Sequence, residues 1–157
     1  MEQVLYKIKP YWLLARFDKP IGILILLWPA LWALWVASNG KPDILVLTVI
    51  CLGVVVMRAA GCVINDYADR DFDPHVERTK LRPIAAGIIS PKHALIFFFS
   101  LLSIAFGLVL LLNTYTILLS FIGAFLAASY PFMKRYTQLP QAYLGTVSYT
   151  HLTLPTI

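Results

Sequence analysis

The amino-acid sequence predicts an all-α transmembrane protein, and three observations support this fold class. Of the 157 residues, 59% are hydrophobic and only 13% are charged, which is too apolar for an ordinary soluble domain. Four long apolar runs alternate with polar segments, and their lengths suit helices that cross the hydrocarbon core. Lys and Arg are concentrated in alternate polar segments, as in proteins oriented by the positive-inside rule.

The first two spans follow an interfacial segment at residues 1–20, where Lys and Arg surround Tyr11 and Trp12. Residues 21–37 form the first span, which we expect to be retained because no small-residue cleavage site precedes Ser38. Pro29 is expected to kink it unless neighbouring helices satisfy the freed carbonyl. A tight polar turn separates this span from the second, residues 44–64, in which Arg58 is the one charged residue.

The third and fourth spans, residues 94–112 and 114–132, contain no charge and are separated at Asn113. Ser90 followed by Pro91 predicts a helix start, because serine can cap and proline fits the first helical position. The distribution of Lys and Arg places the N terminus, the acidic loop and Lys134–Arg135 on the cytoplasmic side. We therefore expect an integral protein of the lipid bilayer, in a bacterial inner membrane.

Other classes of site find less support. The net charge of +5 comes from basic residues between apolar runs, without an aromatic-interleaved stripe, so we expect no nucleic-acid partner. Cys51 and Cys62 both lie in the second apolar run, which favours small core residues over a disulfide. His75 and His93 have no partner at metal-ligand spacing.

The candidate functional centre is the stretch from Asn65 to Asp73, which holds four of the eight acidic residues. In a continuous helix, Asp66, Asp69 and Asp73 would share one face with Asn65 beside them. Like charges on one face repel each other, so a shared cation is expected. Because Asp66 and Asp73 would be about 10 Å apart along that helix, Asp69 is the expected shared ligand.

Oxygen-only ligands favour a hard cation, and Mg²⁺ bridging to a phosphate-bearing substrate fits best. Zinc is disfavoured because no Cys or His cluster accompanies the aspartates. A calcium-binding hand is also disfavoured, since Pro74 and Lys80 stand where glycine and glutamate are needed. The remaining alternative is a solvated acidic loop without a catalytic role.

Cations near the acidic stretch are candidate substrate contacts. Arg78, Lys80 and Arg82 are expected to hold phosphate oxygens, although interfacial cations also contact lipid head groups. Arg58, a charge within a span, is expected to neutralise a substrate carboxylate, with a structural ion pair as the alternative. At the end of the fourth span, Tyr130 and Lys134 would form an aromatic wall and a cation beside Arg135, unless Pro131 interrupts the helix.

Four segments of the chain form a specific combination: Arg16-Phe-Asp-Lys-Pro-Ile-Gly22, Met57-Arg-Ala-Ala-Gly-Cys-Val-Ile-Asn-Asp-Tyr-Ala-Asp-Arg-Asp-Phe-Asp73, Arg78-Thr-Lys-Leu-Arg-Pro83 and Tyr130-Pro-Phe-Met-Lys-Arg-Tyr-Thr-Gln-Leu-Pro-Gln141. On these segments the chain resembles the UbiA superfamily of membrane prenyltransferases over residues 10–145. The resemblance implies that residues 1–145 are the N-terminal half of a bundle of nine transmembrane helices around a central cavity.

The resemblance also implies an activity: Mg²⁺-dependent transfer of a polyprenyl group from polyprenyl diphosphate to 4-hydroxybenzoate, in ubiquinone biosynthesis. By position, Asn65, Asp66, Asp69 and Asp73 would bind the diphosphate through Mg²⁺. Lys134 and Tyr130 would line the diphosphate side, and Arg58 would face the carboxylate of the acceptor.

Two features depart from the family. No Asp or Glu follows Glu77, so a second acidic motif is missing, and residues 146–157 form an anomalous tail without helical periodicity. We therefore expect the 157-residue chain alone to be inactive. The alternative is a non-catalytic membrane fragment or a metal-binding assembly element.

Overall fold

The computed structural model describes residues 2–136, including the side chains of residues 8–125. This described part is helical and contains no strand. Its elements are α1 (Glu2–Leu14), α2 (Ile21–Ala37), α3 (Ile44–Ala68), the short 3₁₀ helix η1 (Asp73–His75), α4 (Pro91–Val109) and α5 (Thr114–Tyr136). The predicted tail at residues 146–157 lies outside the described residues.

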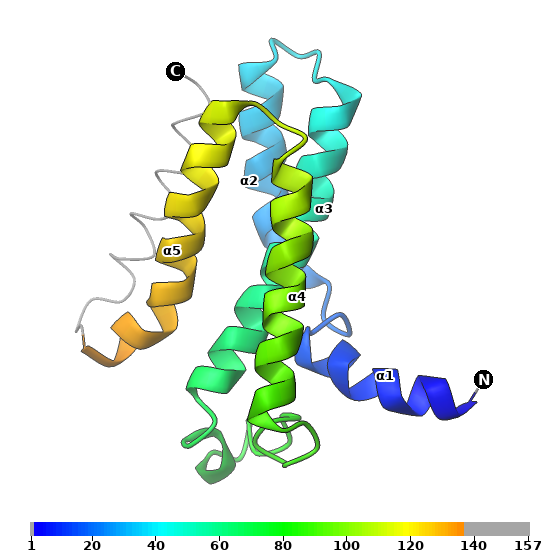
Figure 1. Ribbon diagram of the computed structural model, residues 1–157, viewed down its shortest axis with the longest axis vertical. Helices are drawn as coiled ribbons and strands as arrows, with labels where there is room; N and C mark the ends of the chain where they lie inside the picture. The colour runs from blue at the N-terminus through cyan, green and yellow to red at the C-terminus, as the bar shows by residue number, and fades with distance from the viewer. Residues whose placement is uncertain (1, 137–157) are drawn as a thin grey trace.

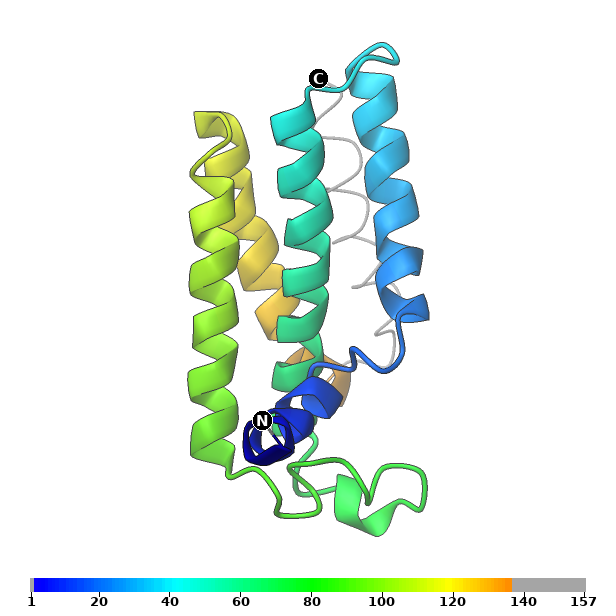
Figure 2. The same cartoon turned by 90° about the vertical axis from the view of Figure 1, so that its right-hand side faces the viewer.

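Helix α3 is the centre of the arrangement, since it contacts each of the other four α-helices. Helices α2, α3 and α4 run along the long axis, whereas α1 lies across one end (Figures 1 and 2). The same end holds the loop between α3 and α4 and the last turns of α5 (Figure 1). The fold thus gathers at one end the three segments predicted to share a membrane side.

The buried core also lies at that end, because α1, α3, α4 and the α3–α4 loop all contribute to it. Leu14 and Ala15 at the end of α1 pack with residues of α3 and α4, and the Tyr11 and Phe97 rings meet edge to face at 5.2 Å. This packing fixes the end of α1 against the cytoplasmic end predicted for α3. The core comprises Leu14, Ala15, Ala59, Ala60, Val63, Ile64, Ile84, Ile89, Ala94, Phe98 and Leu101.

The predicted spans correspond to helices α2 to α5, with small differences at their boundaries. Helices α3 and α4 are long and apolar enough to cross a membrane, while the apolar helical stretches Ile21–Ala37 and Thr114–Phe125 are shorter. Along α2, Trp28 and Trp32 are more than half exposed. Exposed apolar side chains of this size are expected where a helix faces hydrocarbon instead of water.

The local helix signals have mixed outcomes. Ser90 caps α4 as predicted, accepting a hydrogen bond from the backbone N–H of His93, and Pro91 is the first helical residue. Pro29 lies inside α2, and α5 continues through Pro131 to Tyr136. Pro131, which the sequence leaves open as an interruption, therefore does not break the helix, as a membrane helix can tolerate proline where neighbouring groups satisfy the freed carbonyl.

Candidate functional site

The acidic stretch does not continue as one helix. Helix α3 ends at Ala68 with Asp69 as its C-cap, the chain turns, and Asp73 begins η1. The backbone N–H groups of Phe72 and Asp73 both donate to the carbonyl oxygen of Asp69 at 2.9 Å, which closes the turn. The prediction that Asp66, Asp69 and Asp73 share one helical face is therefore wrong, because the helix stops before the second of them.

The turn instead brings Asp73 beside Asp66. Nη1 of Arg82 lies 3.2 Å from Oδ1 of Asp66 and 2.8 Å from Oδ2 of Asp73. The two carboxylates therefore lie well inside the separation of about 10 Å expected for a continuous helix. They do share a cation, and within the described part of the chain that cation is the Arg82 guanidinium.

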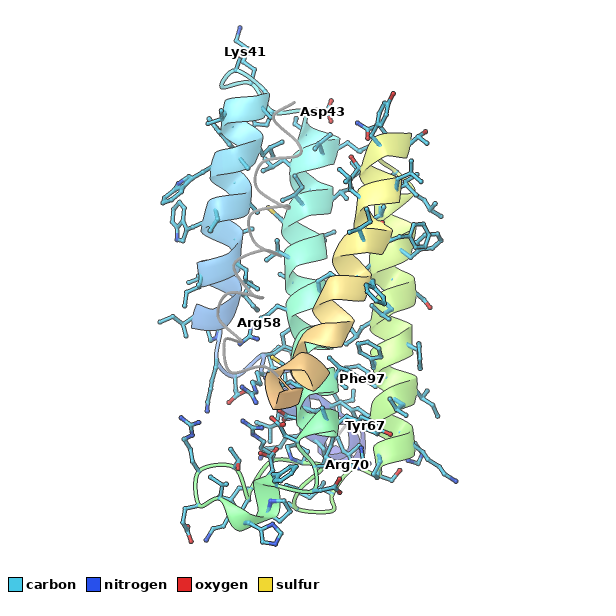
Figure 3. All side chains as sticks on the ribbon, turned by 90° about the vertical axis from the view of Figure 1, so that its left-hand side faces the viewer. Lys41, Asp43, Arg58, Tyr67, Arg70 and Phe97 are labelled. Atoms are coloured by element: carbon cyan, nitrogen blue, oxygen red, sulfur yellow. The ribbon has the colours of Figure 1, made fainter. Side chains whose placement is uncertain are left out.

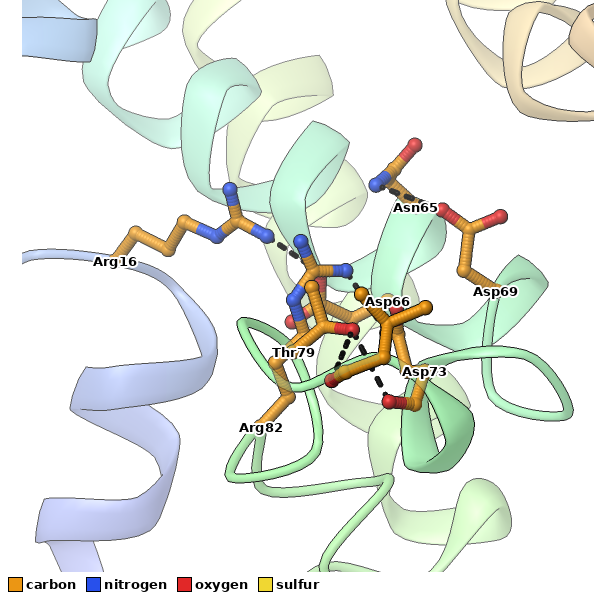
Figure 4. A network of polar contacts seen from close by, with 8 residues as sticks. Arg16, Asn65, Asp66, Asp69, Asp73, Thr79 and Arg82 are labelled. Carbon is orange, nitrogen blue, oxygen red and sulfur yellow. Dashed lines mark hydrogen bonds and ion pairs between the residues drawn. The ribbon is translucent and has the colours of Figure 1, made fainter.

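Arg16, which follows the end of α1, completes the cluster (Figure 4). Its Nη2 donates a hydrogen bond to Oδ1 of Asp66 at 2.8 Å, and Asp66 is only 2% exposed. Two guanidinium groups therefore neutralise one buried carboxylate, which would otherwise carry a large desolvation cost. Sequence reasoning missed this role: Arg16 lies in a segment that carries the family resemblance, but its partner is 50 residues away.

Asn65 and Asp69 point away from this ion cluster (Figure 4). Asn65 Nδ2 donates to Asp69 Oδ2 at 3.4 Å, and both side chains are partly exposed. One turn of helix separates the two residues, so the amide and the carboxylate lie side by side. The acidic stretch thus has two parts: the buried Asp66 and Asp73, and the more accessible Asn65 and Asp69.

Thr79 fastens the loop that carries Asp73. Its hydroxyl donates to the backbone carbonyl oxygen of Asp73 at 3.0 Å, and the side chain is only 6% exposed. Thr79 lies three residues before Arg82, which contacts the Asp73 carboxylate. One short segment therefore holds both the backbone and the carboxylate of Asp73. The position of that carboxylate is therefore tightly determined.

The oxygen donors at this turn suit Mg²⁺ in one mode of binding and not in another. In the part of the chain that the structure describes, no three His, Cys, Asp or Glu side chains converge on a common point. Mg²⁺ commonly takes one or two carboxylates and completes its shell with water and substrate phosphate oxygens. The oxygen-only pair of Asn65 and Asp69 fits this mode, whereas the Asp73 carboxylate pairs with Arg82 in the buried cluster.

The three cations of the α3–α4 loop have different surroundings. Arg82 belongs to the buried ion cluster, and Lys80 pairs with Glu77 at 2.7 Å on the surface. Arg78 is exposed and takes part in no ion pair between described residues. Only Arg82 is thus an integral part of the acidic site in this structure.

Arg58 lies deeper along α3, where its guanidinium packs against Gly22 at the start of α2 (Figure 3). A Cβ added to Gly22 would lie 2.7 Å from Nη2 and 2.8 Å from Nε of Arg58, so only glycine leaves room for the guanidinium there. No ion pair between described residues includes Arg58. The structural alternative, a pairing with an acidic neighbour, is therefore not seen in the described part.

The remaining predicted residues are those at the end of α5, the buried cysteine of α3 and the histidine at the start of α4. Tyr130, Lys134 and Arg135 are in the last turns of α5, but their side chains lie outside the described set. Cys62 is buried and free, in agreement with a core role. His93 contacts the Ser90 hydroxyl through Nδ1 at 2.6 Å at the start of α4, as expected for a helix-start residue.

Comparison with known proteins decides the family. The profile of the UbiA prenyltransferase family matches residues 26–150. The chain belongs to the UbiA prenyltransferase family. Similar curated proteins include the 4-hydroxybenzoate octaprenyltransferases of Methylococcus capsulatus, 72% identical over 135 residues, and Thiobacillus denitrificans, 64% identical over 132 residues. These alignments cover 86% and 84% of this chain but 46% and 45% of the relatives, so the chain spans about half the length of the curated relatives it matches.

Two solved UbiA-type structures share the fold. The apo structure of a UbiA homologue from Aeropyrum pernix K1 superimposes with a TM-score of 0.70 at 31% identity, over 83% of this chain and 48% of that one. A structure described as digeranylgeranylglyceryl phosphate synthase gives a TM-score of 0.79 at 25% identity, over 96% and 52% of the two chains. The predicted all-α transmembrane class and UbiA membership are confirmed.

Proposed function

We propose that the protein carrying this sequence transfers a polyprenyl group from polyprenyl diphosphate to 4-hydroxybenzoate. The observation that carries the proposal is the oxygen-rich turn at the end of α3, in a chain of the UbiA prenyltransferase family. The curated relatives are named for this donor class and this acceptor. That the 157-residue chain is inactive by itself stays a prediction, and an assay of the purified chain tests it.

In this proposal Asn65 and Asp69 hold Mg²⁺, and Asp73, at the same turn, is a further candidate ligand. Asp66 orders the turn from within the buried cluster. Bound Mg²⁺ would supply positive charge to the leaving diphosphate. The exposed Arg78 and Lys80, together with Lys134, add donors for further phosphate oxygens. The protein's own cations thus favour departure of the diphosphate by stabilising its developing negative charge.

The acceptor end is assigned to Arg58. At the end of α5, Tyr130 would line the diphosphate side with Lys134, and Arg135 is a further candidate substrate contact. Arg58 is a cation within a span, and its guanidinium lies against the glycine of α2 without a described acidic partner. A cation in these surroundings gains most from a carboxylate brought by a substrate. The hydroxyl-bearing ring would then lie between Arg58 and the acidic turn.

We expect Arg58→Gln to weaken acceptor binding selectively. Loss of a charge-assisted hydrogen bond corresponds to about 1.5–3 kcal/mol, or roughly a 10-fold to 150-fold rise in KM for 4-hydroxybenzoate. KM for polyprenyl diphosphate should hardly change. Steady-state kinetics of the full-length protein, with each substrate varied in turn, measures both constants. A rise confined to the diphosphate substrate would contradict the assignment.

Gly22→Ala is expected to move Arg58 without removing it. The new methyl group would collide with the flexible end of Arg58, so the guanidinium must shift while the backbone stays in place. We expect KM for 4-hydroxybenzoate to rise about 10-fold and thermal stability to change little. Gly53→Ala is the matched control, because a Cβ there meets no atom within 4 Å. Equal kinetics of both variants would show that the packing against Gly22 does not matter.

A further inference from the structure

Helix α1 ends in a turn at which Arg16 occupies a position that usually holds glycine. The backbone N–H of Phe17 donates to the Trp12 carbonyl oxygen at 3.2 Å, and the N–H of Arg16 donates to that of Leu13 at 3.1 Å. The rings of Trp12 and Phe17 also meet at 4.8 Å. These features define a Schellman motif, in which the residue at the position of Arg16 adopts a left-handed backbone and is usually glycine.

Arg16 has φ = 57°, so an arginine occupies a backbone conformation that favours glycine. The end of α2 provides a direct comparison. There the backbone N–H of Gly40 donates to the Trp35 carbonyl oxygen, and the N–H of Asn39 donates to the Val36 carbonyl oxygen, in the same pattern. There the residue at the position of Arg16 is Asn39, with φ = 50°, and the following Gly40 is also left-handed, with φ = 80°. Asparagine tolerates this region better than most residues. An arginine at the α1 turn therefore costs backbone free energy that a glycine would avoid.

The side chain of Arg16 offers a reason for its presence. It reaches Asp66 at 2.8 Å, Asp66 contacts Arg82 at 3.2 Å, and Arg82 contacts Asp73 at 2.8 Å. This series of contacts runs without a gap from the end of α1 to η1, and it contains two positive and two negative groups. Without Arg16 the cluster would hold two carboxylates and one guanidinium, so Arg82 could no longer balance both Asp66 and Asp73.

We propose that Arg16 is a positioning residue of the prenyl-transfer site: by neutralising Asp66, it leaves Arg82 in place to hold the Asp73 carboxylate at the acidic turn. Arg16 has no substrate contact in this proposal and acts only through Asp66 and Arg82. The proposal rests on the function proposed above. It explains why the αL position of the α1 turn carries an arginine although the backbone alone favours glycine.

The test uses the full-length protein with Arg16→Gly, Arg16→Gln and the double variant Arg16→Gln/Asp66→Asn. Asn39→Gly is the matched control, because it makes the same backbone change in the same motif without an ion pair. We expect Arg16→Gly and Arg16→Gln to lower kcat about 10-fold to 100-fold and to raise the Mg²⁺ concentration for half-maximal activity, as when a supporting partner of a metal ligand is lost. Asn39→Gly should leave both values unchanged.

A second measurement avoids activity. Thermal unfolding in detergent without Mg²⁺ should show a lower Tm for Arg16→Gln than for the unaltered protein. The double variant should recover part of that Tm and part of kcat, because an uncharged Asp66→Asn no longer needs a guanidinium partner. If the double variant has the same Tm and the same kcat as Arg16→Gln, Arg16 does not act through Asp66, and the proposal is overturned.

The two proposals fail in different ways. Unchanged kcat and Mg²⁺ dependence in Arg16→Gly, with normal prenyl transfer by the unaltered protein, would overturn the role of Arg16 alone. Absence of transfer by the unaltered protein would overturn the proposed function, and with it the role of Arg16 in that reaction. The Tm values of the single and double variants would then still show whether Arg16 and Asp66 are coupled.

Discussion

Asp69→Asn in the full-length protein is expected to lower prenyl transfer by roughly 100-fold to 1000-fold, comparable with the loss of one preorganised electrostatic contact in other enzymes. The substitution removes a charge that the proposal gives to Mg²⁺, yet it keeps the shape of the side chain. An amide oxygen at residue 69 can still accept the hydrogen bond from Asn65. The loss should therefore appear in activity and Mg²⁺ dependence rather than in folding.

Asp71→Asn is the matched control for this experiment. Asp71 belongs to the same turn, but its side chain is 68% exposed and pairs only loosely with Arg70, at 3.7 Å. Its activity should stay close to that of the unaltered protein, because exposed ion pairs contribute little. Equal activity of both variants would contradict the assignment of Asp69 to the metal, and membrane insertion of each is checked by extraction from the membrane fraction.

Arg82→Ala is expected to have the largest effect on stability. It would remove the one guanidinium that contacts both Asp66 and Asp73, and it would leave two largely buried carboxylates close together. Breaking a buried ion pair by removing one partner costs about 3–5 kcal/mol. The turn after α3 should therefore loosen. In detergent, proteolysis within residues 69–90 should be faster for Arg82→Ala than for the unaltered protein.

Lys80→Ala provides the control, since Lys80 and Glu77 form an ion pair in the same loop with 47% and 89% of their side chains exposed. An exposed pair contributes about 0–1 kcal/mol, so the Tm should hardly move. Thermal unfolding in one detergent, with the proteolysis rate as a second measure, compares the two variants. Equal Tm values for Arg82→Ala and Lys80→Ala would contradict the importance given to the buried cluster.

Much of the fold follows from local sequence. The apolar runs predicted α2 to α5, because a helix satisfies its own backbone hydrogen bonds and an apolar stretch of sufficient length suits the bilayer. The start of α4 followed from Ser90 and Pro91, whose capping chemistry depends only on neighbouring residues. The chemical nature of the acidic stretch, oxygen ligands without sulfur or imidazole, was also evident from residue types alone.

The geometry of the site needed the tertiary structure. The sequence places Asp66 and Asp73 seven residues apart and supports a continuous helix, but the chain turns after Ala68 and brings the two carboxylates to one guanidinium. Arg16 reaches Asp66 only because the buried Leu14 and Ala15 fix the end of α1 against α3. Residue type thus determined what the acidic stretch can bind, whereas packing between distant segments decided which charges meet, since an ion pair depends on separation in space.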